Sequence, residues 1–154
     1  MSAKSTAQNN IVKRVTTMKK IKHERGQSLV ELAVSLVLLL LLLSGAVEFG
    51  MAFFQYIQLR DAAQEGALYG SINPDQDDKI IARTQGASNS PIDLTTITPS
   101  ITYSGSSPHC EGQGITVKLT YDHKIFMPFI TAIVGPKITL SAQVTDTILT
   151  PVCP

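Results

Sequence analysis

The fold of this chain is decided by one stretch near its N-terminus, Gly26–Val47, which reads GQSLVELAVSLVLLLLLLSGAV. Within it, Leu32–Val47 is 16 residues long and contains no charged side chain, and apolar residues on both sides extend the segment. It therefore reaches the roughly 20 residues that a membrane-spanning helix needs. The sequence predicts a single transmembrane helix at this position.

One carboxylate, Glu31, lies close to the start of the apolar segment. An ionised carboxylate so near the bilayer costs on the order of a few kcal/mol unless a partner neutralises it. Ser28 stands three residues earlier, which is the spacing of a capping box at a helix N-terminus. Capping of its own helix is therefore the simplest explanation of Glu31 from local sequence.

A basic segment, residues 1–26, precedes the apolar stretch. It holds seven of the 13 Lys and Arg residues but only one of the 12 acidic residues, so the rest of the chain carries a net charge of −5. Without apolar periodicity it reads as a disordered, removable leader, and its positive charge predicts a cytoplasmic N-terminus. A nucleic-acid-binding patch would need a folded basic face or interleaved aromatic residues, so we expect no nucleic-acid partner.

The length of 154 residues suffices for a membrane anchor and one small domain, and it excludes a large two-domain enzyme. We expect a leader at residues 1–26 and a transmembrane helix with a helical stalk at residues 27–70. A small extracytoplasmic domain should follow at residues 71–154.

The stalk is predicted from a stripe of apolar residues beyond the membrane. Phe49, Phe53 and Ile57 recur every four residues, and Ala63 and Ala67 continue close to the same stripe. Polar side chains supply the surface expected to face water: Gln55, Gln58, Arg60, Asp61, Gln64 and Glu65. The amphipathic pattern indicates that the helix leaves the bilayer and continues along the outer domain.

A three-stranded antiparallel sheet is predicted for most of the outer domain. Apolar and polar side chains alternate over residues 97–103, 115–122 and 138–145, as in strands with one buried face. That face needs a cover, and the stripe of the stalk is the nearest candidate. We therefore expect an α+β fold, in which a long N-terminal helix packs on a small antiparallel sheet.

Two short helices are expected within the same domain. The first covers residues 79–87 and follows three aspartates, which favour a helix N-terminus over a calcium site. The second is apolar, covers residues 125–133, and ends at Gly135 and Pro136. We expect it to cap the sheet, and a contact with a partner or with the membrane surface is the alternative.

The two cysteines flank the second and third predicted strands. Cys110 lies just before residues 115–122, and Cys153 lies just after residues 138–145. If these strands pair antiparallel, the two cysteines meet, and closing so long a loop contributes roughly 4 kcal/mol in the chain-entropy model. A disulfide indicates an oxidising compartment, and two free buried thiols are the alternative.

A search for an active site finds no candidate in the sequence. His109 adjoins a cysteine, but no second Cys/His pair at ligand spacing accompanies it, and His123 is expected in a solvated turn. Glu48 is expected at the outer membrane interface, where it needs only water or a snorkelling contact. The common nucleophile, phosphate-binding, dinucleotide and zinc-protease motifs are absent from the sequence. We therefore expect no enzyme, no cofactor and no metal.

The segment Glu24–Gly70 resembles a known family. The run from Gly26 to Glu31 is similar to the cleavage region of type IV prepilins, in which a membrane peptidase cuts after the glycine. Together with VEFG at Val47–Gly50 and AAQEGALYG at Ala62–Gly70, it resembles the TadE-like family of tight-adherence, Flp-type pilus systems. Leu32, Val37 and Met51 depart from the family pattern, which often has an aromatic residue, a proline and an arginine there.

This resemblance implies a minor pilin or pseudopilin that takes part in pilus assembly and adherence. Prepilin peptidase would cut between Gly26 and Gln27, and the new amine of Gln27 would pair with Glu31 of a neighbouring subunit. The implied partners are the peptidase, other major and minor pilins, the inner-membrane assembly platform and membrane lipid. The implied location is a single pass of the cytoplasmic membrane with the C-terminal domain outside, and incorporation into an extracellular pilus.

A strip of small residues on the stalk is a candidate packing surface. Ala62, Gly66 and Gly70 are spaced by four and leave the helix surface flat, so another helix or the sheet can approach closely. We expect packing against the chain's own domain, and packing against a second helix is the alternative.

Two other readings of the whole chain remain open. Ser44, Gly45 and Ala46 would suit a signal-peptidase cut before Val47, which would release a soluble protein. The apolar core is longer than the roughly 7 to 15 residues usual for such signals. The remaining alternative is an uncleaved, membrane-anchored enzyme or binding domain.

Overall fold

A computed structural model describes residues 24–153, so most of the expected leader, residues 1–26, lies outside the described residues. The described residues divide between two units, bounded as Met1–Leu43 and Ser44–Pro154. The elements along the chain are α2 (Glu24–Ile72), α3 (Asp77–Gly86), the 3-10 helix η1 (Leu94–Thr96), β1 (Ser100–Tyr103), β2 (Gly114–Lys124), α4 (Pro128–Val134) and β3 (Lys137–Thr147).

The first unit is described only by the start of α2. Every side chain from residue 26 to residue 43 is exposed, and Leu38 and Leu42 have exposed fractions of 58% and 67%. The helix is long and apolar enough to cross a membrane, and no residue of its most apolar window is buried inside the protein. Residue 37 is a valine, and α2 passes this position without interruption.

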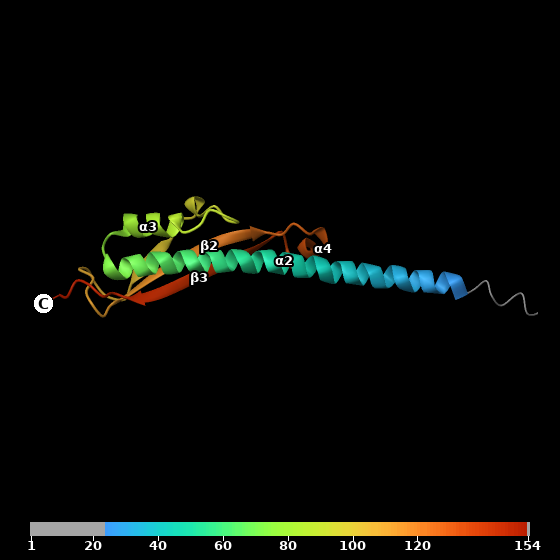
Figure 1. Cartoon of the computed structure of the whole chain (residues 1–154), viewed down its shortest axis with the longest axis horizontal. Helices are drawn as coiled ribbons and strands as arrows, with labels where there is room; N and C mark the ends of the chain where they lie inside the picture. Colours follow the sequence, from blue (N-terminus) through green and yellow to red (C-terminus); the bar gives the residue numbers. More distant parts are fainter. Residues whose placement is uncertain (1–23, 154) are drawn as a thin grey trace, which may run out of the picture. The chain divides into compact units, whose positions relative to one another are not determined.

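The second unit contains a three-stranded antiparallel sheet in the order β1-β2-β3. β2 and β3 pair over their full lengths, from Gly114 opposite Thr147 to Lys124 opposite Lys137. These two strands run along the C-terminal part of α2, with α3 beside it (Figure 1). The predicted α+β fold, a long helix packed on a small antiparallel sheet, is confirmed.

The core of this unit lies between α2, α3 and the sheet. β2 supplies its centre, because Ile115, Val117 and Leu119 alternate along the strand and are fully buried. The other core residues come from the remaining elements and loops: Leu59, Ala62, Ala63, Ala67, Ile80, Ile92, Leu94, Ile97, Ala142 and Ile148.

The stripe predicted to cover the sheet is wrong in its aromatic half. Phe49 and Phe53 have exposed fractions of 72% and 53%, whereas Ala63 and Ala67 are fully buried. The side of α2 that meets the sheet is lined by small residues, which let the strands approach closely. Large aromatic rings at that contact would hold the two layers apart, and Phe49 and Phe53 remain outside it.

The expectation that the apolar helix before Gly135 caps the sheet is also wrong. α4 has no buried residue, and Phe129 and Ile133 have exposed fractions of 68% and 74%. Ile125 alone of the predicted apolar set is buried, where its N–H donates to the carbonyl of Pro136 and closes the loop. A helix of seven residues at the end of two paired strands is too short to fold back over their apolar face.

Candidate functional site

The predicted processing and assembly residues lie together at the start of α2. Gly26, Gln27 and Glu31 are helical and exposed. Among residues 26–153, whose side chains are described, no ion pair involves Glu31. Because α2 already includes Glu24, Ser28 lies inside the helix, and the capping-box explanation of Glu31 is wrong. The carboxylate therefore lies on an exposed helix surface, available to a partner.

The small-residue strip of the stalk faces the chain's own domain. Ala62, Gly66 and Gly70 are buried. A Cβ atom added to Gly66 would overlap Thr84 Oγ1 and lie 3.4 Å from Val117 Cγ1. One added to Gly70 would overlap the Ile115 side chain and lie 3.1 Å from Ile80 Cδ1. α3 and β2 thus occupy this strip and leave no room there for a second helix.

A buried polar cluster joins α2 to the end of β2. Glu48 has an exposed fraction of 4%, and its Oε1 atom lies 3.1 Å from His123 Nε2. The same oxygen accepts a hydrogen bond from the backbone N–H of Phe126 at 3.1 Å. On the other side of the ring, His123 Nδ1 lies 2.6 Å from Gln55 Oε1. The expected solvated turn at His123 and the expected hydrated position of Glu48 are both wrong.

The cluster depends on periodicities that sequence reasoning overlooked. β2 continues to Lys124, so His123 keeps the inward parity of Ile115, Val117 and Leu119. Glu48 and Gln55 are seven residues apart, which places them on the same face of α2 two turns from each other. The cluster could have been recognised from His123 at an inward position of the strand and from Glu48 and Gln55 on one face of the helix.

The chemistry of the cluster follows from its donors and acceptors. An imidazolium ring of His123 donates to both Glu48 Oε1 and Gln55 Oε1, and a neutral ring satisfies both contacts only if the Gln55 amide is turned. Glu48 Oε2 is buried without a hydrogen-bond partner among the described residues. This arrangement binds helix to strand, and its removal leaves buried polar atoms unpaired.

A second buried amide pins a loop to α2. Gln58 Nε2 donates to the Ile92 carbonyl at 2.8 Å, and the Ile92 N–H donates to Gln58 Oε1 at 2.9 Å. The prediction that Gln58 faces water is therefore wrong. Ile92 lies in a loop, and these two hydrogen bonds satisfy its buried backbone N–H and carbonyl groups.

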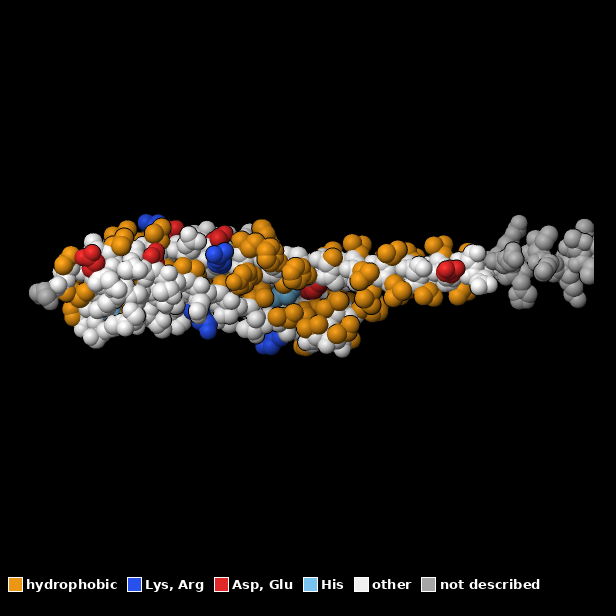
Figure 2. All heavy atoms as spheres, turned by 90° about the horizontal axis from the view of Figure 1, so that it is seen from below, with side chains coloured by type: hydrophobic (Ala, Val, Ile, Leu, Met, Phe, Trp, Pro, Cys, Tyr) orange, Lys and Arg blue, Asp and Glu red, His pale blue; other side chains and the backbone are white. Residues whose placement is uncertain are grey.

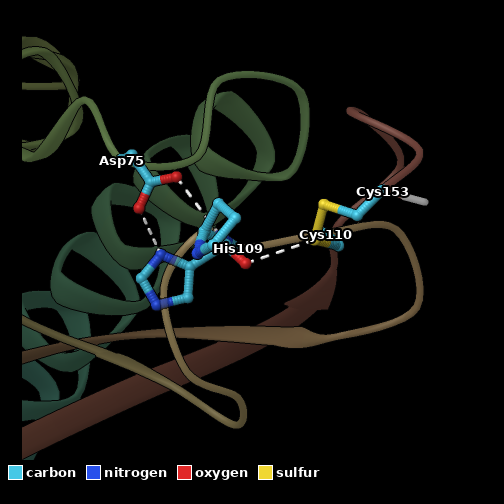
Figure 3. The surroundings of a disulfide bond; sticks show 5 residues. Asp75, His109, Cys110 and Cys153 are labelled. Carbon is cyan, nitrogen blue, oxygen red and sulfur yellow. Dashed lines mark hydrogen bonds and ion pairs between the residues drawn. A yellow bond between two sulfur atoms is a disulfide. The ribbon is translucent and has the colours of Figure 1, made fainter.

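At the far end of the sheet, a disulfide joins Cys110 to Cys153, with 5.6 Å between their Cα atoms (Figure 3). Beside it, the backbone N–H of His109 donates to Asp75 Oδ2 at 3.3 Å, and its ring contacts Asp75 Oδ1. The ring also stacks on Tyr103, with 3.7 Å between centroids. These contacts hold the turn before α3 against β1 and the disulfide loop.

The carboxylates near this end serve α3 and its neighbours. Asp77 and Asp78 lie in the first turn of α3, where their negative charge interacts favourably with the helix dipole and stabilises the helix. Tyr103 donates its hydroxyl to Asp77 Oδ1 at 2.7 Å; burial, and then this hydrogen bond, raise the pKa of Tyr103 well above its usual value. No group of three His, Cys, Asp or Glu in the described part of the chain is arranged to hold a metal.

Comparison with known proteins adds one finding. Residues 26–68 match the model of the family described as TadE-like protein, which confirms the resemblance seen in the sequence. The match begins at Gly26 and ends inside α2. The chain matches no curated protein and no solved structure.

Proposed function

Starting from the TadE-like segment at residues 26–68, which relates the chain to tight-adherence pili, we propose that it is a minor pilin. In this proposal, prepilin peptidase cuts after Gly26, and the apolar part of α2 holds the chain in the cytoplasmic membrane until the assembly platform incorporates it. The observation that carries the proposal is the continuous helix α2, whose N-terminal part is wholly exposed and whose C-terminal part carries a folded domain. By family resemblance, major Flp-type pilins are little more than such a helix, so the added domain favours a minor subunit.

The exposed start of α2 supports subunit assembly. Leu and Val side chains cover its surface from residue 29 onward, and such a surface is stable only in lipid or against other helices. Glu31 interrupts this surface with a charge. After cleavage, the free amine of Gln27 on a neighbouring pilin neutralises the carboxylate, so two charges that are unfavourable alone in lipid become acceptable together.

The stalk supports the same reading with a second exposed surface. Phe49 and Phe53 stack with 6.1 Å between ring centroids and, with Phe54, remain exposed on α2. Since the chain's own sheet packs on the small-residue strip of the helix and leaves these rings exposed, they are available for contacts with neighbouring subunits. The Cys110–Cys153 disulfide supports a domain that lies outside the cytoplasm.

N-terminal sequencing of the mature protein is the primary test of processing. We expect the mature chain to begin at Gln27, and we expect Gly26→Val to retain the leader. Neither Gly26 nor Gly50 has an atom within 4 Å of an added Cβ, so Gly50→Val is the matched control and should be processed normally. A start at Val47 would instead indicate a secreted protein, and a start at Met1 or Ser2 an uncleaved anchor.

The assembly role of Glu31 is tested by its replacement with alanine. We expect Glu31→Ala to insert into the membrane normally but to reduce co-purification with partner pilins at least about tenfold, the equivalent of about 1.4 kcal/mol. Glu65→Ala, which removes an exposed carboxylate from the same helix beyond the membrane, should leave co-purification unchanged. Normal recovery of partners with Glu31→Ala would refute the proposed role of this carboxylate.

A further inference from the structure

The segment Ile125–Pro136, here named the α4 loop, is an exposed apolar surface to which the proposed pilin function assigns no contact. It contains α4 and has no charged residue, although Lys124 and Lys137 stand directly before and after it. Its largest side chains point away from the core: Phe126, Phe129 and Ile133 have exposed fractions of 72%, 68% and 74%. Figure 2 shows hydrophobic side chains gathered at this end of the Ser44–Pro154 unit.

Contacts within the unit set the level of the α4 loop along α2. A Cβ atom added to Gly45 would lie 3.9 Å from Ile130 Cδ1, and the N–H of Phe126 donates to Glu48. The loop is therefore beside residues 45–48 of the helix. Glu48 of α2 also contacts His123 at the end of β2, and both side chains are buried. The loop is therefore fixed to α2 as well as to β2 and β3.

This level coincides with the outer edge of the predicted membrane span. The uncharged run Leu32–Val47 that is predicted to span the membrane ends directly before Glu48. When this run spans the bilayer, Gly45 lies near its outer end, and any segment in contact with Gly45 meets the outer interface.

We propose that the α4 loop lies in the outer interface of the bilayer, where Phe126, Phe129 and Ile133 contact lipid. The inference rests on the proposed function to the extent that α2 spans the membrane. Lys124 is exposed at the start of the loop, where its ammonium group reaches lipid phosphates while the apolar residues after it enter the acyl boundary. Lys137, at the other end of the loop, is paired with Asp122 at 2.6 Å.

A bilayer fits this surface better than a second protein does. A stable protein interface buries about 800 Å² on each partner, whereas the α4 loop offers three large exposed side chains around a helix of seven residues. An interfacial segment needs no such area, because each aromatic or branched side chain gains independently from leaving water. The α4 loop would also give the domain a second membrane contact beside α2.

Single tryptophans test this placement, because the natural chain contains none. The full chain carrying Phe129→Trp is reconstituted, one copy per nanodisc, in phosphatidylglycerol and phosphatidylcholine brominated near the top of the acyl chains. Leu149→Trp is the matched control: Leu149 is 58% exposed, and its N–H donates to Ser71, about 39 Å along α2 from Gly45. Leu38→Trp, in the predicted span, reports whether α2 enters the bilayer.

We expect the brominated lipid to quench Phe129→Trp at least about threefold more strongly than Leu149→Trp, and acrylamide in the water to quench it less. Equal bromolipid quenching of these two variants, with Leu38→Trp quenched, would overturn the α4 proposal while leaving the membrane span intact. An unquenched Leu38→Trp would overturn the span itself, and with it the proposed function and this inference. Since each disc holds one chain, protection of Phe129→Trp from both quenchers would also count against lipid contact.

Discussion

Replacement of Glu48 by alanine is expected to destabilise the Ser44–Pro154 unit by about 2 to 6 kcal/mol, because two hydrogen-bond donors lose their acceptor at a cost of about 1 to 3 kcal/mol each. The variant leaves His123, which is 1% exposed, without its Nε2 partner, and it removes the acceptor of the Phe126 N–H. A small domain has a total stability of about 5 to 15 kcal/mol, so much of it would be lost. Urea unfolding of the full chain in detergent, followed by near-ultraviolet circular dichroism, measures the effect.

A double-mutant cycle separates pairing from helix effects. If Glu48 acts through His123, the variant carrying both Glu48→Ala and His123→Leu should be less destabilised than the sum of the single variants, because no buried ring is left unpaired. Glu31→Ala on the same helix is the control for loss of an exposed carboxylate and should leave the stability of this unit unchanged. A Glu48→Ala variant within about 0.5 kcal/mol of the parent would contradict the assigned role, since that is the usual range for surface substitutions.

Gly66→Leu is expected to destabilise the same unit by about 3 kcal/mol or more, at or beyond the upper end of typical overpacking costs. Even the first carbon of the new side chain would overlap Thr84 Oγ1, and Thr84 is itself fully buried and donates to the Ile80 carbonyl. Thr84 is β-branched, so its side chain has few other rotamers in which it would avoid the overlap. α3 and β2 must therefore move away from α2, and thermal melting of the full chain in detergent should show the loss.

Gly50→Leu is the matched control for this prediction. It lies on the same helix, where an added Cβ has no atom within 4 Å, so it tests helix propensity without the steric conflict. We expect it to be neutral or to stabilise by up to about 1 kcal/mol, because leucine is a better helix former than glycine. If both variants melted alike, close approach of helix and sheet at Gly66 would not be the reason for that glycine.

The strands illustrate what local pattern predicts well. Alternation over residues 115–122 and 138–145 identified β2 and β3 because one face of each strand is buried and the other meets water. β1 is shorter than predicted: it begins at Ser100, because η1 holds the chain just before Ile97. There Asp93 caps η1 through Thr95, and these hydrogen bonds lower the pKa of Asp93.

The stalk illustrates what local pattern does not decide. A helix with Phe49, Phe53 and Ile57 on one stripe and Ala62, Gly66 and Gly70 on another has two surfaces able to pack. Hydrophobicity alone favours packing of the aromatic stripe against the sheet. The sheet instead packs closely on the small residues of the helix, and Gln58 and Glu48 are buried in the same domain. The correct face depends on the shape of a partner that lies far away in the sequence.

By itself, the sequence determined the membrane-length helix, the TadE-like segment around Gly26 and Glu31, and the strand pattern of the outer domain. These properties depend on composition and on periods of two or 3.6 residues, which neighbouring positions encode directly. Only the tertiary structure decided that His123 contacts Glu48, that Thr84 packs closely against Gly66, and that the α4 loop remains exposed beside Gly45. Each is a contact, or the lack of one, between elements distant along the chain, where the cost of an unpaired polar atom or a steric overlap outweighs local hydrophobic preference.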